Sequence, residues 1–170
     1  MIKPTTIPLA GYIYQTLVGF KLLAEWLDDP GRYEWMTFEA DEKGAKGLDD
    51  LVAARSDGLR ELTQVKFTVD AFRPEHALSW EWLLSRKGSR GTSLLQKWST
   101  ATTELGFASV YSATLLTNRR PDDEFAAQLA GAHVDYPRLS TELKSRIDNE
   151  LGGTDKAQEF FSLFRFDHSF

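Results

Sequence analysis

The stretch LDDLVAARSDGLRELTQVK, residues 48–66, decides the fold of this chain. Residues 50–55 and 59–69 have the composition of strands, with apolar and β-branched side chains in both. Between them, Ser56-Asp57-Gly58 is a turn signal typical of a β-hairpin. The stretch therefore predicts two antiparallel strands joined by a tight turn, to which the remaining elements can be added.

Upstream of the hairpin, the sequence predicts one helix and one strand. Apolar residues recur at helical spacing from Ile7 to Leu27, which indicates a helix of about five turns. The run from Tyr33 to Glu39 is aromatic and alternating, as expected for a strand. By this alternation, Tyr33 shares one face of the strand with Trp35 and Thr37.

Downstream of the hairpin, the pattern is mostly helical. A helix is expected after Pro74, a second at Thr92–Leu105, and a strand at Ala108–Leu116. The last part of the chain carries three helical segments, at Glu124–Leu129, Arg138–Leu151 and Lys156–Phe164.

The predicted fold class is α+β, in which helices pack on a mixed sheet in α-β-β-β-α-β order. We expect a single domain over residues 1–170, with a core at about residues 8–120 and a helical tail at 121–170.

Composition narrows the class of protein further. The chain has 170 residues, a net charge of −5 and no cysteine. The lack of cysteine excludes a disulfide framework, a thiolate zinc site and a cysteine nucleophile. No run approaches the ~18 apolar residues of a membrane span, and the N-terminus does not resemble a signal peptide. We therefore expect a cytoplasmic protein with no membrane partner.

The charge is distributed unevenly along the chain. Residues 86–120 carry six basic side chains against one acidic one, a net charge of +5, while the segments on either side are each −5. Contacts between such residues and phosphates give affinity for nucleic acid without sequence preference. The candidate DNA-binding residues are Arg86, Lys87, Arg90, Lys97, Arg119 and Arg120.

Polar residues that suit phosphodiester chemistry lie at one end of the predicted sheet. Gln64 and Lys66 are two apart in a strand and share a face, and the hairpin places Asp50 opposite them. Asp50 and Glu39 can supply carboxylates to Mg²⁺, and Gln64 can complete the shell. Lys66 can activate water and stabilise charge on phosphorus. Asp49 is the rival for the place of Asp50, because alternation lets only one of the two face the site.

Four features in this order resemble the PD-(D/E)XK nuclease superfamily, whose members share the restriction-endonuclease-like fold. They are Gly11-x-x-Tyr14-Gln15, Glu39, the segment 48–52 and Gln64-Val65-Lys66. The Gln-x-Lys form is similar to the Mrr-like branch. The whole set resembles effector nuclease domains of bacterial antiphage systems, of the CBASS and STAND-NTPase types, and the resemblance covers roughly residues 8–120.

The resemblance implies roles for these residues. Asp50 matches the metal-binding acid and Lys66 the catalytic lysine. Gln64 stands where most members carry Asp or Glu, and Glu39 matches the additional upstream acid of Mrr-like members. Gln15 matches a polar helix residue that faces the site.

The implied function is a Mg²⁺-dependent endonuclease, with Mn²⁺ as an alternative metal, that degrades double-stranded DNA with little sequence specificity. Such a domain is the N-terminal effector of a larger antiphage protein, with a sensor or NTPase module in cis, and is active as a homo-oligomer. Two alternatives stay open: a catalytically inactive nucleic-acid-binding or assembly module on the same fold, and RNA as the substrate.

Overall fold

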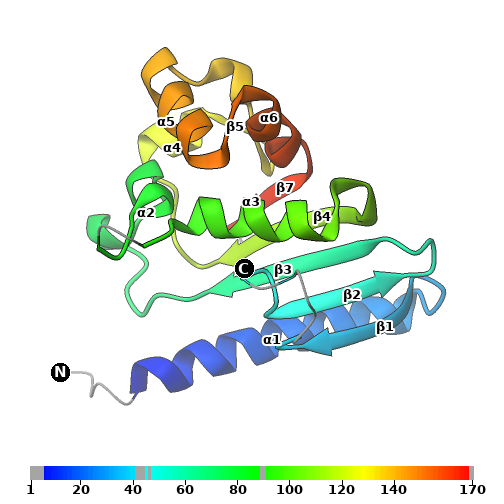
Figure 1. The fold of residues 1–170 in the computed structure, drawn as a ribbon. Helices are drawn as coiled ribbons and strands as arrows, with labels where there is room; N and C mark the ends of the chain where they lie inside the picture. Colours follow the sequence, from blue (N-terminus) through cyan, green and yellow to red (C-terminus); the bar gives the residue numbers. More distant parts are fainter. Residues whose placement is uncertain (1–5, 41–44, 46, 89–90, 169–170) are drawn as a thin grey trace.

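The computed structural model describes residues 6–40, 45, 47–88 and 91–168 (Figure 1). Its centre is a five-stranded mixed sheet with the strand order β1-β2-β3-β4-β7. The pairs β1–β2 and β2–β3 are antiparallel, and the pairs β3–β4 and β4–β7 are parallel. The strands are β1 (Tyr33–Phe38), β2 (Leu51–Arg55), β3 (Arg60–Lys66), β4 (Val110–Thr117) and β7 (Phe164–Asp167).

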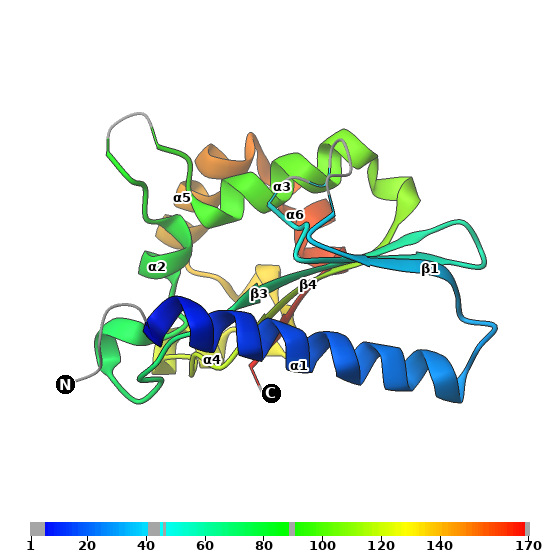
Figure 2. The ribbon, with the colours of Figure 1, turned by 90° about the horizontal axis from the view of Figure 1, so that it is seen from below.

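Helices cover both faces of the sheet. The long helix α1 (Thr6–Asp28) runs along one face, and the other helices gather on the opposite side (Figures 1 and 2). Those helices are α2 (Trp80–Leu84), α3 (Leu94–Leu105), α4 (Asp123–Ala127), α5 (Thr141–Leu151) and α6 (Thr154–Leu163). The predicted α+β class and the order of its first six elements are confirmed, and the helix expected after Pro74 is the short α2.

Strand parity assigns the side chains of β3 to the two faces. Val65 is buried against Tyr14 and Val18 of α1, in the smaller of two apolar clusters. Leu62 belongs instead to the larger cluster beneath α3. Gln64 and Lys66 have the parity of Leu62, so they point to the α3 side, as the sequence predicts.

The first strand departs from simple alternation. Tyr33 pairs with Arg55, but Trp35 pairs with Ala54, so β1 carries one extra residue at this point. This β-bulge moves Tyr33 onto the α1 face, where its ring meets Trp26 edge-on at 6.1 Å. The prediction that Tyr33 shares a face with Trp35 is therefore wrong, because an inserted residue reverses the alternation.

The predicted helical tail contains strands as well as helices. A hairpin of β5 (Leu129–Ala130) and β6 (His133–Val134) follows α4, and β7 adds to the edge of the main sheet beside β4. The expected helix at 156–164 ends at Leu163, since Phe164 and Phe166 are buried in the sheet core. Phe164 stacks on Trp98 of α3 at a centroid distance of 5.2 Å, which joins the tail to the core.

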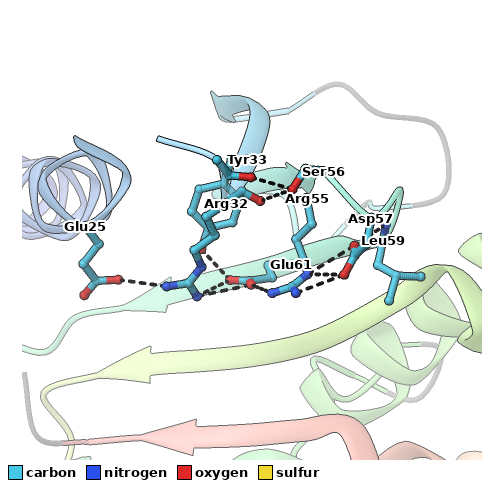
Figure 3. Close-up of polar contacts among 9 residues, drawn as sticks. Glu25, Arg32, Tyr33, Arg55, Ser56, Asp57, Leu59 and Glu61 are labelled. Atoms are coloured by element: carbon cyan, nitrogen blue, oxygen red, sulfur yellow. Dashed lines mark hydrogen bonds and ion pairs between the residues drawn. The ribbon is translucent and has the colours of Figure 1, made fainter. Parts of the chain in front are cut away.

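A cluster of charged side chains fastens the sheet at the end where β3 begins (Figure 3). Glu61 accepts hydrogen bonds from Arg55 at 2.9 Å, Tyr33 Oη at 2.8 Å and Arg32 at 3.2 Å. Burial and the Glu61 hydrogen bond raise the pKa of Tyr33 well above its usual value. One carboxylate thus connects β1, β2, β3 and the connection that follows α1.

Among the described residues, no helix combines the length and the apolar character that crossing a membrane requires.

Replacing Glu61 with Ala is expected to lower the free energy of unfolding by about 1–3 kcal/mol, because two guanidinium groups and a phenol lose their shared acceptor. Urea unfolding followed by circular dichroism measures this. Glu34→Ala, at an exposed position of the same strand pair, should change the free energy by less than about 0.5 kcal/mol. Equal effects of the two substitutions would contradict a stabilising role for Glu61.

Candidate active site

The hairpin brings the predicted site residues to one end of the sheet. Leu51 pairs with Thr63, so the antiparallel register places Asp50 opposite Gln64. Lys66 is the last residue of β3, and its main-chain oxygen accepts a hydrogen bond from Thr117 Oγ1 at 2.6 Å. Strand pairing therefore brings Asp50 next to Gln64, with Lys66 two residues further along β3.

The Asp50 carboxylate is the centre of the cluster. Its Oδ2 atom accepts hydrogen bonds from the Val65 amide at 2.7 Å and from Gln64 Nε2, and it lies 4.0 Å from Lys66 Nζ. All three contacts converge on Oδ2, and among the described residues none reaches Oδ1. One carboxylate oxygen is thus committed to the protein, while the other is available to a ligand.

Burial governs the electrostatics of this pair. It raises the pKa of Asp50, against the opposing influence of the Lys66 ammonium and the Val65 hydrogen bond. It also lowers the pKa of Lys66, while the charges of Asp50 and Asp49 partly restore it. Both charged forms are disfavoured by the same partly desolvated surroundings, so a bound cation would favour ionised Asp50.

Of the two adjacent aspartates, Asp50 faces Gln64 and Lys66. The Asp49 carboxylate instead accepts a hydrogen bond from the Gly47 amide at 3.1 Å, which closes a turn in the preceding loop. The Asp49 main-chain oxygen accepts from the Ala40 amide at 2.8 Å. Asp49 therefore shapes the loop, although its charge is close enough to influence Lys66.

Gln15 and Glu39 approach Asp50 through its main chain. The Glu39 amide donates to the Asp50 carbonyl oxygen at 3.0 Å, and Gln15 Nε2 donates to the same oxygen at 3.5 Å. Glu39 has a φ of 45°, in the left-handed region that side chains other than glycine rarely adopt. These contacts hold the residue that carries the central carboxylate.

The Glu39 carboxylate itself does not join the cluster. Its side chain is exposed and lines a groove of about 470 Å³ with Gln15, Phe20 and Phe38, on the α1 side. Within the described residues, no hydrogen bond or ion pair connects the Glu39 carboxylate to Asp50, Gln64 or Lys66. The structure therefore brings together Asp50, Gln64 and Lys66, and places Glu39 beside them.

The oxygen atoms of the cluster fit a magnesium ion that keeps most of its waters. Among the described residues, no hydrogen bond is donated to Asp50 Oδ1 or to the Gln64 amide oxygen, because the contacts of this cluster use Asp50 Oδ2 and the Gln64 amide nitrogen. Mg²⁺ is commonly held by one or two carboxylates with water and substrate phosphate. Within the described ranges, however, no three His, Cys, Asp or Glu side chains form a metal-binding group.

A basic pocket opens next to the cluster. Lys66 lines this pocket of about 480 Å³ together with Lys87, Lys97 and Arg119, and no acidic residue is among its described lining. Phe67 and Trp82 also contribute to its lining. Four cations around one hollow favour an anion such as a phosphate.

The predicted DNA-binding residues divide into three groups. Lys87, Lys97 and Arg119 lie at the basic pocket. Arg86 is instead paired with Glu150, with Nε 3.3 Å from the carboxylate, and Arg120 lies over the Phe72 ring at 4.0 Å. Arg90 lies outside the described residues.

Arg119 is held unusually firmly for a pocket residue. Its Nη1 atom donates to the His76 carbonyl oxygen at 2.7 Å, and its guanidinium lies 4.4 Å from the Trp82 ring centroid. Burial lowers the pKa of Arg119, and its buried Nε atom has no hydrogen-bond partner in the described part of the chain. Arg119 therefore places a fixed positive charge at the wall of the pocket.

Sequence reasoning missed the residues that support the end of β3. Asn118 bonds both the amide and the carbonyl oxygen of Thr68, at 2.8 and 2.7 Å, and Thr117 holds the Lys66 carbonyl. Only their position in the sequence could have indicated them. They lie at the carboxyl end of β4, which pairs in parallel with β3, and the carboxyl ends of parallel strands meet at one edge of a sheet.

In comparisons with known proteins, no family model matches the chain and no curated protein sequence matches it. The interpretation of the site therefore depends on the motif residues and on the geometry described above.

Removing the Lys66 charge with Lys66→Met is expected to raise the pKa of Asp50 further, because the ammonium is the main influence that opposes burial. A folded-state pKa above the unfolded value of about 3.9 means that stability falls as pH rises between the two values. This loss should be larger in the variant. An NMR titration of the Asp50 carboxyl carbon measures the pKa, with Lys87→Met as the control; an unchanged or lowered pKa in Lys66→Met would contradict the account.

Proposed function

We propose that this protein is a metal-dependent endonuclease that hydrolyses double-stranded DNA with little sequence specificity. The observation that carries the proposal is the juxtaposition of the Asp50–Gln64–Lys66 cluster with a pocket lined by Lys87, Lys97 and Arg119. Phosphodiester hydrolysis needs a metal ligand set, a group that handles the proton of water, and cations that hold phosphate. These requirements are supported by neighbouring residues on one edge of the sheet.

In this proposal, Asp50 and Gln64 hold Mg²⁺ or Mn²⁺ through oxygen atoms, and Glu39 is a further candidate ligand from the α1 side. When bound, the metal supplies positive charge that offsets the charge developing on the phosphate. Gln15 acts as a positioning residue through the Asp50 carbonyl oxygen. The amide of Gln64 brings no charge. The proposed ligand set therefore carries one negative charge fewer than it would with Asp or Glu at position 64.

Lys66 has two properties that suit it to the reaction. Its lowered pKa increases the population of the neutral amine, which can accept a proton from the attacking water. In the charged form it can donate hydrogen bonds to the phosphate oxygens as the bond to the leaving oxygen breaks. The nearby Asp50 carboxylate keeps its amine directed at the cluster.

The basic pocket supports DNA as the substrate class. Lys87, Lys97 and Arg119 offer contacts to backbone phosphates, which carry no sequence information. We further propose, from the resemblance stated above, that the chain is the N-terminal effector of a larger cytoplasmic antiphage protein. A sensor or NTPase module in cis would then bring several copies together for activity.

A second candidate function is a catalytically inactive nucleic-acid-binding or assembly module. Two observations favour it. The Glu39 carboxylate lies outside the cluster. Asp50 Oδ2 accepts a hydrogen bond from the Val65 amide, as it would in a purely structural role. Metal-dependent cleavage separates the two candidates.

The nuclease proposal predicts that the protein degrades plasmid DNA in Mg²⁺ or Mn²⁺ and that EDTA stops the reaction. Lys66→Met and Asp50→Asn should each reduce the rate at least about 100-fold, because each removes a group that acts in the transition state. Lys156→Met, which changes an exposed lysine of α6 that belongs neither to the cluster nor to the described lining of the basic pocket, should cut at the wild-type rate. Intact plasmid with both metals, or full activity in Lys66→Met, would favour the inactive module.

Binding of duplex DNA in EDTA should weaken with salt, and Lys97→Gln should lower the slope of log K against log salt by about 1, as expected for one lost phosphate contact. Arg86→Gln is the matched control, because Arg86 is already paired with Glu150. An unchanged slope in Lys97→Gln would remove the pocket from the DNA-binding surface. Tighter binding and faster cleavage of duplex RNA would change the proposed substrate class.

A further inference from the structure

The outer face of α1 is apolar and uncovered. Six large apolar side chains on this helix are more than half exposed: Leu9, Tyr12, Ile13, Leu17, Phe20 and Leu27. The opposite face, with Tyr14 and Val18, already packs on the sheet. Both ribbon views show α1 as the outermost element on its side of the described structure (Figures 1 and 2). A helix with apolar side chains on two opposite faces usually has both faces buried against other parts of a protein.

The distribution of charge along α1 supports a covered face. From residue 9 to residue 20 the helix contains no charged side chain. Its charged residues, Lys21, Glu25 and Asp28, all fall in the last third. A helix face that stays in water normally carries charges along its length, so the first part of α1 has the composition of an interface.

We propose that the outer face of α1 pairs with the same face of α1 in a second copy of this chain, with the two helices antiparallel. The exposed residues Ile13, Leu17 and Phe20 and the following Ala24 and Leu27 are spaced by steps of four and three. This spacing is typical of a seam between two helices. A two-fold axis uses one patch twice, so no second, different surface is required.

The antiparallel arrangement follows from the positions of the apolar and charged residues. The spaced positions 9, 13, 17, 20, 24 and 27 are nearly symmetric about the middle of α1, so an antiparallel pair sets Leu9 of one copy level with Leu27 of the other. The charged end of each helix then lies beside the uncharged part of its partner. Parallel helices would instead place Lys21 beside Lys21 and Glu25 beside Glu25, which repel.

The available area meets the requirement of a small dimer interface. Six side chains that are more than half exposed present on the order of 100 Å² each, or roughly 1,200 Å² over two copies. Specific interfaces begin at about this size. Phe38 is also 41% exposed and lines the neighbouring groove with Phe20, so it extends the same surface. We expect a dissociation constant in the micromolar range rather than an obligate dimer.

The pairing gives a surface for the homo-oligomer of the proposed function, but its argument uses neither DNA nor metal. Sedimentation equilibrium of the 170-residue chain, without either, should show a reversible dimer. Phe20→Glu should raise the dissociation constant at least 100-fold while its thermal unfolding stays cooperative. Phe72→Glu is the matched control, since Phe72 is 75% exposed and lies beside Arg120 in a hollow to whose described lining α1 contributes no residue. A wild-type monomer at 100 µM, or equal dimerisation of the two variants, would overturn the proposal.

Orientation can be tested because the chain contains no cysteine. A mixture of Leu9→Cys and Leu27→Cys should form a disulfide-linked heterodimer on mild oxidation, since these positions are level in the antiparallel pair. Leu27→Cys alone should not cross-link efficiently. Efficient cross-linking of Leu27→Cys alone, or no heterodimer from the mixture, would overturn the antiparallel arrangement.

Discussion

The hydrogen bond from the Val65 amide to the Asp50 carboxylate is the contact on which the site depends. It occurs where the β2–β3 ladder ends, because Asp49 turns its main-chain oxygen towards Ala40 and leaves the Val65 amide without a strand partner. A side-chain carboxylate takes that place and is thereby drawn into a partly buried position. Gln64 and Lys66, on either side of Val65, approach the same oxygen with their side chains. Strand pairing and the candidate chemistry share one interaction.

Local sequence patterns were sufficient to predict the β2–β3 hairpin and the faces of β3. The Ser56-Asp57-Gly58 turn sets the register, and the alternation of β3 separates Val65 from Gln64 and Lys66. The periodicity of residues 7–27 likewise predicts α1 to within about one residue at each end. These features are determined by neighbours in sequence, which is why they could be predicted without a structure.

Other features depend on contacts between distant segments. The bulge in β1 that turns Tyr33 towards α1 has no local signal, and neither has the change from helix to strand at Phe164, which packing on Trp98 favours. The left-handed backbone at Glu39 directs its side chain to the α1 groove, although its place at the end of a strand suggested the metal shell. The net charge of −5 likewise does not describe the local charge at the site. Folding brings Lys66, Lys87, Lys97 and Arg119 together around one pocket.

The central claim is that the cluster around Asp50 binds a divalent metal. A crystal structure of the protein grown with Mn²⁺, with anomalous diffraction data, tests it most directly. The account predicts an anomalous peak within about 2.5 Å of both Asp50 Oδ1 and the Gln64 amide oxygen. The Val65 amide would meanwhile keep its bond to Oδ2. A peak elsewhere, or a Lys66–Asp50 pair with no metal beside it at millimolar Mn²⁺, would contradict the claim.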